Sequence, residues 1–309
     1  MNMQPIHALI DNVEKVIIGK RSVIELAVIS LLCRGHALLE DVPGTGKTML
    51  ARALSRSVAV DMKRLQCTPD LLPSDITGVP IYNQKTGDFE FRPGPVFTSI
   101  LLADEINRAT PRAQSALLEC MEEFRVSVDG STYDLPPVFM VLATQNPIDM
   151  AGTHVLPEAQ LDRFLVRLSV GYPTPAEEVK ILGAQALSHP IEHLKPVATE
   201  AEIEAAREAV RRIHIGQEVA EYIARISAAT REHDGLRLGA SPRGTLALAR
   251  AARAFAFLRG RDYVTPDMVK YMAPPVLAHR LIVRPQAAAS GQTAGRILND
   301  VLAHVPPPV

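Results

Sequence analysis

A short stretch near the start of the sequence combines two glycines, a lysine and a threonine directly after an apolar segment. The order is Gly44-Thr45-Gly46-Lys47-Thr48, preceded by the apolar residues 36–39 and followed by apolar residues at helical spacing. Glycines let backbone N–H groups turn inward around an anion, and a helix N-terminus adds the positive end of its dipole. Lys47 can reach the β- and γ-phosphates of a nucleotide, and the hydroxyl of Thr48 can bind Mg²⁺. The stretch therefore predicts a strand, a phosphate-binding loop and a helix.

The residues just before these glycines belong to the same predicted loop. Asp41, Val42 and Pro43 precede Gly44, so Asp41 stands where the common pattern G-x-x-x-x-G-K-[ST] has its first glycine. The two glycines nearest the phosphates remain, and we expect residues 41–48 to bind nucleotide.

A second stretch places two carboxylates at the end of another apolar segment. Residues 99–103 are typical of a buried strand, and Asp104 and Glu105 follow it directly. Asp104 can hold Mg²⁺, and Glu105 can act as the base that orients and polarises an attacking water molecule. Two carboxylates can also simply end a strand in solvent. Together with Lys47 and Thr48, however, this pair favours hydrolysis of a nucleoside triphosphate.

A third predicted strand ends in polar residues that would lie beside these carboxylates. Residues 139–143 are apolar, and Thr144, Gln145, Asn146 and Pro147 follow them. The carboxyl ends of parallel strands meet at one edge of a sheet, so we select Asn146 as a contact for the γ-phosphate or the attacking water. The alternative is that Asn146 only terminates the strand.

The composition fits a globular chain long enough for two domains. Of 309 residues, 47% are hydrophobic and 22% are charged, and the net charge is −1. This charge argues against a broadly basic nucleic-acid-binding protein. Cys33, Cys67 and Cys120 form no C-x-x-C pair, which indicates a reducing compartment. The N-terminus lacks the features of a secretory signal, and no apolar run reaches the ~20 residues of a membrane span. We therefore expect a cytoplasmic protein.

Hydrophobic periodicity predicts the other elements of the chain. Helices are expected at residues 6–16, 22–33 and 111–123, and further strands at residues 60–67 and 166–170. Two segments, residues 81–91 and 126–135, are typical of β-hairpins inserted into this core. The composition changes at residues 172–175, after which the chain is rich in alanine, arginine and glutamate and is helical in pattern, as at residues 200–212, 218–233 and 242–259.

With these motifs placed, the sequence resembles the MoxR family of AAA+ ATPases over nearly its whole length. Asp41 in place of the first glycine is usual in that family. The resemblance rests on residues 39–48 and on the strings Ala103-Asp104-Glu105-Ile106-Asn107-Arg108-Ala109, Ala143-Thr144-Gln145-Asn146-Pro147, Leu161-Asp162-Arg163-Phe164, Ser241-Pro242-Arg243 and Gly260-Arg261-Asp262-Tyr263-Val264.

The resemblance implies an α/β fold made of a core domain and a lid. The core, residues 1–172, would be an AAA+ P-loop domain with a five-stranded parallel sheet between helices. Residues 173–309 would form an all-α lid domain. The two hairpins would be the helix-2 insert, at about residues 78–95, and the pre-sensor hairpin, at about residues 125–135.

The family pattern also implies roles for individual residues. Asn146 would be the first sensor, and Arg163 would be the finger that reaches the γ-phosphate held by a neighbouring subunit. Arg243 would be the second sensor, reaching from the lid to the nucleotide of its own chain. Either arginine could otherwise form an ordinary surface ion pair. Ile18 and Gly19 would contact adenine.

The leading hypothesis for function is an ATPase that remodels other proteins. By resemblance it would use ATP and Mg²⁺, form a ring, expected to be a hexamer, and activate or mature a client protein together with a partner that carries a von Willebrand factor A domain. Two alternatives are an AAA+ ATPase that acts on nucleic acid and a nucleotide-gated scaffold with little hydrolysis. The near-neutral charge disfavours the former. The intact Glu105, Asn146, Arg163 and Arg243 disfavour the latter.

Overall fold

A computed structural model describes residues 2–146, 154 and 156–308, so Pro147 of the predicted sensor string lies outside the described residues. Its centre is a five-stranded sheet in the order β2-β5-β8-β1-β9, with all neighbouring strands parallel. The strands are β1 (Ala37–Glu40), β2 (Met62–Gln66), β5 (Ile100–Asp104), β8 (Met140–Gln145) and β9 (Val166–Leu168). The predicted five-stranded parallel sheet is confirmed.

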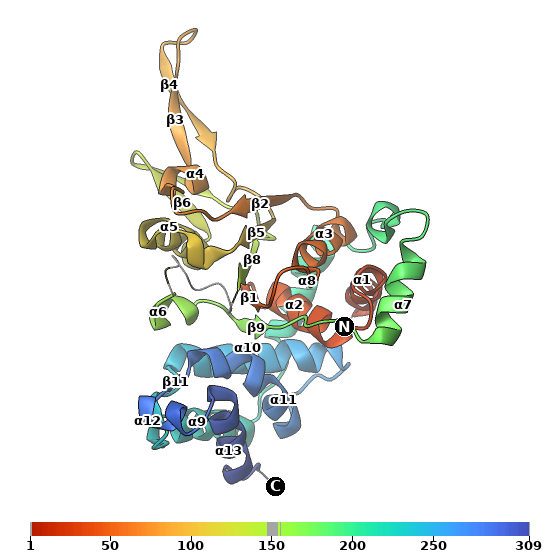
Figure 1. Ribbon diagram of the computed structural model, residues 1–309, viewed down its shortest axis with the longest axis vertical. Coiled ribbons are helices and arrows are strands. Elements are labelled where there is room, and N and C mark those ends of the chain that lie inside the picture. The colour runs from red at the N-terminus through yellow and green to blue at the C-terminus, as the bar shows by residue number, and fades with distance from the viewer. Residues whose placement is uncertain (1, 147–153, 155, 309) are drawn as a thin grey trace.

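Helices cover both faces of this sheet because its central strands are apolar on both sides. One face presents Leu39, Leu102 and Leu142 to a core shared with α1, α2 and α3. The opposite face presents Leu38 and Val141 to a second core under α5. The sheet is seen edge-on between these layers in Figure 1. The helices and helical turns of this part are α1 (Gln4–Glu14), α2 (Arg21–Leu32), α3 (Lys47–Val58), α4 (Pro73–Thr77), η1 (Ile106–Arg108), α5 (Pro111–Glu123) and α6 (Glu158–Leu161).

The two predicted hairpins are present. One consists of β3 (Gly78–Asn83) and β4 (Asp88–Pro93), which pair along their full length and project from the β2 side of the molecule (Figure 1). Its base is tight, since a Cβ on Gly78 would lie 2.3 Å from the carbonyl oxygen of Arg92, and Gly78 has φ +100°. The other hairpin consists of β6 (Arg125–Val128) and β7 (Ser131–Asp134).

The C-terminal part is a helical lid that lies beyond β9 (Figure 1). A two-stranded antiparallel ribbon, β10 with β11, adds to the expected helices. The elements are α9 (Gln217–Glu232), β10 (Leu236–Leu238), α10 (Pro242–Leu258), α11 (Pro266–Leu277), η3 (Ala278–Arg280), β11 (Ile282–Val283), α12 (Pro285–Ala289) and α13 (Ala294–His304). No helix in the described part of the chain is long and apolar enough to cross a membrane.

The segment between the sheet and the lid packs against the core. It contains α7 (Pro175–Ala184), η2 (Pro190–His193) and α8 (Glu200–Arg211). Asn12 of α1 donates a hydrogen bond to the carbonyl oxygen of Lys195, and Arg207 of α8 donates one to that of Leu31 at the end of α2. On these contacts we propose that the lid begins after α8, later than the boundary at residue 173 expected from composition.

Candidate active site

The predicted phosphate-binding loop connects β1 to α3 in a conformation that requires glycine. Gly44 has φ +86° and Gly46 has φ +90°, in the left-handed region. A Cβ on Gly44 would meet nothing within 4 Å, and Gly44 and Gly46 border an open cavity. The Nζ atom of Lys47 donates hydrogen bonds to the carbonyl oxygens of Asp41 and Val42, at 2.6 and 3.1 Å. Partial burial lowers the pKa of Lys47, and the carboxylates around it oppose that effect.

The side chain of Asp41 points away from this open space. Its buried carboxylate accepts hydrogen bonds from the Ser169 hydroxyl, at 2.9 Å, and from the backbone N–H groups of Val170 and Gly171. The carboxylate therefore ties the end of β1 to the chain that follows β9. The geometry gives Asp41 the part of an anchor for the loop, and its side chain does not reach the expected position of the phosphates.

Thr144 of β8 contacts both acidic residues at the end of β5, Asp104 through its side chain and Glu105 through its backbone. The Thr144 hydroxyl donates to Oδ1 of Asp104, at 2.6 Å, and accepts from the backbone N–H of Glu105, at 2.8 Å. Glu105 has φ +58°, a left-handed conformation that is uncommon for residues other than glycine. Its Oε2 atom lies 3.2 Å from Nε of Arg108. Thr144 thus fixes the carboxylate of Asp104 and the backbone of Glu105 at one edge of the sheet.

Two residues of β2 that were not among the predicted site residues complete this network. The Arg64 guanidinium forms an ion pair with Asp104, with its nearest nitrogen 2.5 Å from Oδ2, and also donates to Oε1 of Gln66. The amide nitrogen of Gln66 in turn donates to Oε2 of Glu105, at 3.2 Å. The available signal was the break in apolar alternation of this strand at Lys63 and Arg64. To interpret this break, one must know that β2 pairs with β5, with Gln66 opposite Asp104.

These groups line one cavity of about 460 Å³, a volume typical of ligand sites. It brings together the predicted Pro43, Gly44, Gly46, Lys47, Thr48, Asp104, Glu105 and Asn146 with Arg64, Gln66 and Thr144. Val42, Thr45, Ile18 and Gly19 do not line it. The connection between α1 and α2, which contains Ile18 and Gly19, nevertheless lies close to the phosphate-binding loop, because a Cβ on Gly46 would lie 3.8 Å from Cδ1 of Ile17.

The donor set of this cavity fits Mg²⁺ held jointly with phosphates. The described residues contain no group of three or more His, Cys, Asp or Glu side chains able to hold a metal on their own. Thr48 and Asp104 offer one hydroxyl and one carboxylate, both oxygen ligands, in the same cavity. Mg²⁺ is commonly bound by one or two such side chains together with substrate phosphates and water.

Arg163 and Arg243 lie elsewhere, at the edge of the sheet where the strands begin. Both contact Glu122 at the end of α5. The guanidinium of Arg243 donates to Oε1 of Glu122, and Nε of Arg163 lies 3.2 Å from Oε2. The phosphate-binding loop follows the opposite end of the four-residue strand β1, which spans roughly 13 Å. The expectation that Arg243 reaches the nucleotide site of its own chain is therefore not met in this structure.

Comparison with known proteins agrees with this geometry. The AAA family, described as ATPases associated with various cellular activities, matches residues 36–166, and an AAA lid domain matches residues 228–301. An uncharacterized protein of Bacillus subtilis, YeaC, is 50% identical over 97% of this chain and 94% of its own length. The chaperone MoxR1 of Mycobacterium tuberculosis is 40% identical over 94% of this chain and 79% of its own length.

A solved structure extends the likeness to three dimensions. A candidate ATPase from Cytophaga hutchinsonii has a TM-score of 0.92 at 37% sequence identity and covers 99% of this chain and 95% of its own. The sequence and structural matches both establish ATP hydrolysis as the activity of the chain. Since MoxR1 matches almost all of the sequence at an identity well above that of a shared fold alone, the chain belongs to the MoxR family of AAA+ ATPases.

Proposed function

We propose that this ATPase works as a ring, expected to be a hexamer. Each active site in this ring is built from two neighbouring subunits. ATP hydrolysis in the ring would remodel, activate or mature a client protein, with a von Willebrand factor A domain protein as partner. The name of the relative MoxR1, a chaperone, supports a client of this kind.

The observation that carries this proposal is that the phosphate-binding and hydrolytic residues lie far from the arginines expected to stabilise the γ-phosphate. Lys47, Asp104 and Glu105 lie at the edge where the sheet strands end, whereas Arg163 and Arg243 lie where the strands begin. Phosphoryl transfer needs positive charge on the γ-phosphate oxygens, and guanidinium groups supply it with fixed geometry. In a head-to-tail ring, each subunit presents one edge to the next, and both halves then meet at every interface.

Within this arrangement the residues divide the work as follows. Lys47 and the backbone of the loop bind the phosphates, and Asn146 contacts the γ-phosphate or the water. Glu105 polarises the attacking water, and Gln66 and Arg108 hold its carboxylate. Mg²⁺, when bound through Thr48 and Asp104, neutralises charge on the phosphates. The arginines of the neighbouring chain add charge stabilisation only after assembly.

The β3–β4 hairpin supports contact with a protein client. It projects from the body of the molecule (Figure 1), and its aromatic side chains Phe89 and Tyr82 are 72% and 52% exposed. Exposed aromatic residues on a projecting element are typical of a surface that binds another protein. The near-neutral net charge makes nucleic acid a weaker candidate for the client.

Two measurements test this function. The ATPase rate per subunit should rise steeply with protein concentration and with the appearance of the ring in mass photometry. Activity that stays constant down to fully monomeric dilution would contradict shared sites.

The client is sought with tagged Glu105→Gln chains, which should bind ATP without turnover and retain the client. The same pulldown with the additional change Phe89→Ser should lose that client while ATP binding stays normal. An unchanged set of bound proteins would remove the hairpin from the client-binding surface.

A further inference from the structure

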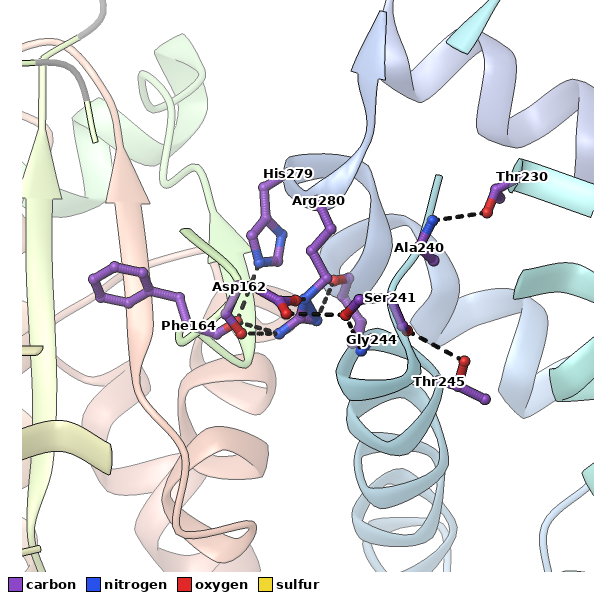
Figure 2. Close-up of polar contacts among 10 residues, drawn as sticks. Asp162, Phe164, Thr230, Ala240, Ser241, Gly244, Thr245, His279 and Arg280 are labelled. Atoms are coloured by element: carbon purple, nitrogen blue, oxygen red, sulfur yellow. Dashed lines mark hydrogen bonds and ion pairs between the residues drawn. The ribbon is translucent and has the colours of Figure 1, made fainter. Parts of the chain in front are cut away.

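The core and the lid are joined by a buried arginine, Arg280 of η3. Its side chain is 3% exposed, and its Nε atom donates to Oδ1 of Asp162, at 2.7 Å. The same guanidinium donates to the carbonyl oxygens of Asp162 and Phe164, at 3.0 and 2.6 Å, and to that of Val276, at 2.8 Å. Figure 2 shows the Arg280 guanidinium directed at Asp162 and Phe164, on the chain between α6 and β9.

The other oxygen of Asp162 extends the network to α10. The hydroxyl of Ser241 donates to Oδ2 of Asp162, at 2.9 Å, and accepts from the backbone N–H of Gly244, at 3.2 Å, as the N-cap of α10 (Figure 2). One carboxylate of the core therefore holds two separate elements of the lid. We call Asp162, Ser241 and Arg280 the junction clamp.

The junction clamp lies directly beside both arginines of the proposed trans site. Arg163 is the next residue after Asp162, and Arg243 lies in the first turn of α10, two residues after Ser241. Their guanidinium groups come together on the single carboxylate of Glu122, one on each oxygen. The position of Arg243 relative to Arg163 is thus set by hydrogen bonds to Asp162.

The space around Glu122 is suited to an anion. A cavity of about 240 Å³ opens there, and its charged lining consists of five arginines against two carboxylates, Glu122 and Asp162. The arginines are Arg34, Arg163, Arg243, Arg250 and Arg280. The Nε atom of Arg163, although close to Glu122, lacks a well-aligned hydrogen bond in the described structure. The arginines therefore outnumber the carboxylates, and they could bind an anion that carries more negative charge than Glu122 does.

A purely stabilising role does not explain why the junction is built from charges. Burial lowers the pKa of Arg280 to about 10 even though Asp162 opposes the shift, so the charged form pays a net desolvation cost. Buried ion pairs are often no more stabilising than apolar packing of the same shape. The charged groups instead fix the orientation of the backbone at Arg163, because Arg280 donates hydrogen bonds to the carbonyl oxygens of the residues on either side, Asp162 and Phe164.

We propose that the junction clamp of Asp162, Ser241 and Arg280 positions Arg163 and Arg243 around one anion, and that Glu122 occupies the place where the terminal phosphate of a neighbouring subunit's ATP binds. This inference rests on the proposed shared site. The clamp residues are positioning residues, since they act through the two arginines and do not touch the nucleotide.

The first test compares two helix N-caps of the lid. Ser241→Ala removes the N-cap of α10 together with its bond to Asp162, whereas Thr293→Ala removes the N-cap of α13, which has no such bond. Ser241→Ala should lower kcat about threefold to tenfold, the worth of one hydrogen bond, and leave the affinity for ATP unchanged. Thr293→Ala should leave kcat unchanged. Equal loss of thermal stability in both variants without a loss of kcat in either would overturn the proposal.

The second test asks on which side of the interface the clamp acts. Arg280→Gln is mixed with Glu105→Gln, which keeps an intact clamp and finger, and separately with Arg163→Ala, which lacks the finger. Activity should recover in the first mixture and not in the second. Arg280→Lys should retain an intermediate kcat because it keeps the charge and one bond. Where Arg280→Gln does not fold, Ser241→Ala replaces it in both mixtures, and the rate per Ser241→Ala chain should rise only beside Glu105→Gln.

A reference mixture separates this inference from the proposal on which it rests. If Arg163→Ala mixed with Glu105→Gln regains no activity, the shared site itself is wrong. If that mixture recovers but the clamp variants do not recover beside Glu105→Gln, the shared site stands and the junction clamp is only structural.

Discussion

At the scale of residues, every ionisable group of the candidate active site already has a partner within the protein. Lys47 binds two carbonyl oxygens of its own loop, Asp104 pairs with Arg64, and Glu105 contacts Gln66. Charged groups gathered in a partly buried cavity are costly unless they are paired. Phosphates and Mg²⁺ must therefore exchange these contacts for their own, which makes the residues testable one at a time.

Binding and hydrolysis should separate in two variants. Lys47→Ala should abolish ATP binding, because the loop loses the cation that faces the phosphates. Glu105→Gln should bind ATP normally and lose turnover by a factor on the order of 10²–10⁴, the usual worth of a positioned general base. Equilibrium titration with ATP and steady-state assays measure both. Equal affinity of Lys47→Ala and wild type would remove the basis of the site.

Arg64 should compete with Mg²⁺ for Asp104. Arg64→Ala frees this carboxylate, and exposed ion pairs are worth about 0.2–1 kcal/mol. The Mg²⁺ concentration for half-maximal ATPase activity should therefore fall by roughly 1.4-fold to 5-fold. Lys63→Ala is the matched control, since it removes a neighbouring exposed cation whose side chain leaves the strand on the other face. A higher Mg²⁺ requirement in Arg64→Ala would mean that Arg64 supports Asp104 as a ligand.

The sequence alone predicted the groups that follow a local pattern and missed those that depend on contacts distant in the chain. Lys47 and Thr48 are marked by adjacent glycines, and Asp104 by the apolar run before it. The break in apolar alternation at Arg64 does not reveal its role, since its partner lies 40 residues away in sequence on the neighbouring strand. Arg243 was assigned to the correct helix start, but its distance from its own phosphate-binding loop depends on how the lid packs.

At the scale of elements, His36 joins three of them at the edge where the strands begin. Its Nδ1 atom accepts a hydrogen bond from the backbone N–H of Val141 in β8, at 2.9 Å. Its Nε2 atom lies 2.9 Å from the carbonyl oxygen of Met121 in α5, to which it donates in the neutral ring. A proton on Nδ1 would face the N–H of Val141. The neutral tautomer is thus the one that holds α5, and with it Glu122, against the start of β1.

This arrangement predicts a loss of stability in mild acid. Burial lowers the pKa of His36 to about 4, and Arg207 lowers it further, against the opposing hydrogen bond to Met121. Because the pKa in the folded state is below the ordinary value of about 6.5, the stabilisation is complete above pH ~6.5 and is lost as the pH falls towards 4. The loss is at most about 3 kcal/mol from this residue.

The measurement is the free energy of unfolding between pH 4 and 7, from urea titrations. His36→Gln should show a shallower fall than wild type, while the exposed His304→Gln should follow the wild-type curve. Buried His279, whose pKa is also lowered, contributes in the same direction in all three proteins. Parallel curves for His36→Gln and wild type would exclude His36 as the source.

The sequence anticipated most elements because their patterns are local. The strands β1, β5 and β8 are short apolar runs that end in polar residues, and the helices of the lid have regular apolar spacing. The residue at which the lid begins was harder to predict from the sequence. The proline-rich change at residues 172–175 reports a change of local structure, whereas the proposed later boundary rests on long-range contacts such as that of Arg207 with Leu31.

At the scale of the whole molecule, the chain presents two regions suited to anions at opposite edges of one sheet. One contains the phosphate-binding loop, and the other contains the arginines around Glu122. Neither region is complete for phosphoryl transfer by itself. In the proposed ring, a repeated head-to-tail contact would join one region to the other at every interface, and this single mode of assembly would account for both locations.

The most direct test of this account mixes two inactive variants. Arg163→Ala keeps the phosphate-binding loop and Glu105, and Glu105→Gln keeps ATP binding and the finger. In an equal, randomly assembled mixture, about one quarter of the interfaces join an intact hydrolytic edge to an intact finger. The account predicts recovery of about a quarter of wild-type ATPase activity, greatest at the equal ratio and falling on either side. Mixed rings, verified by mass spectrometry to contain both chains, that show no more activity than the separate variants would contradict it.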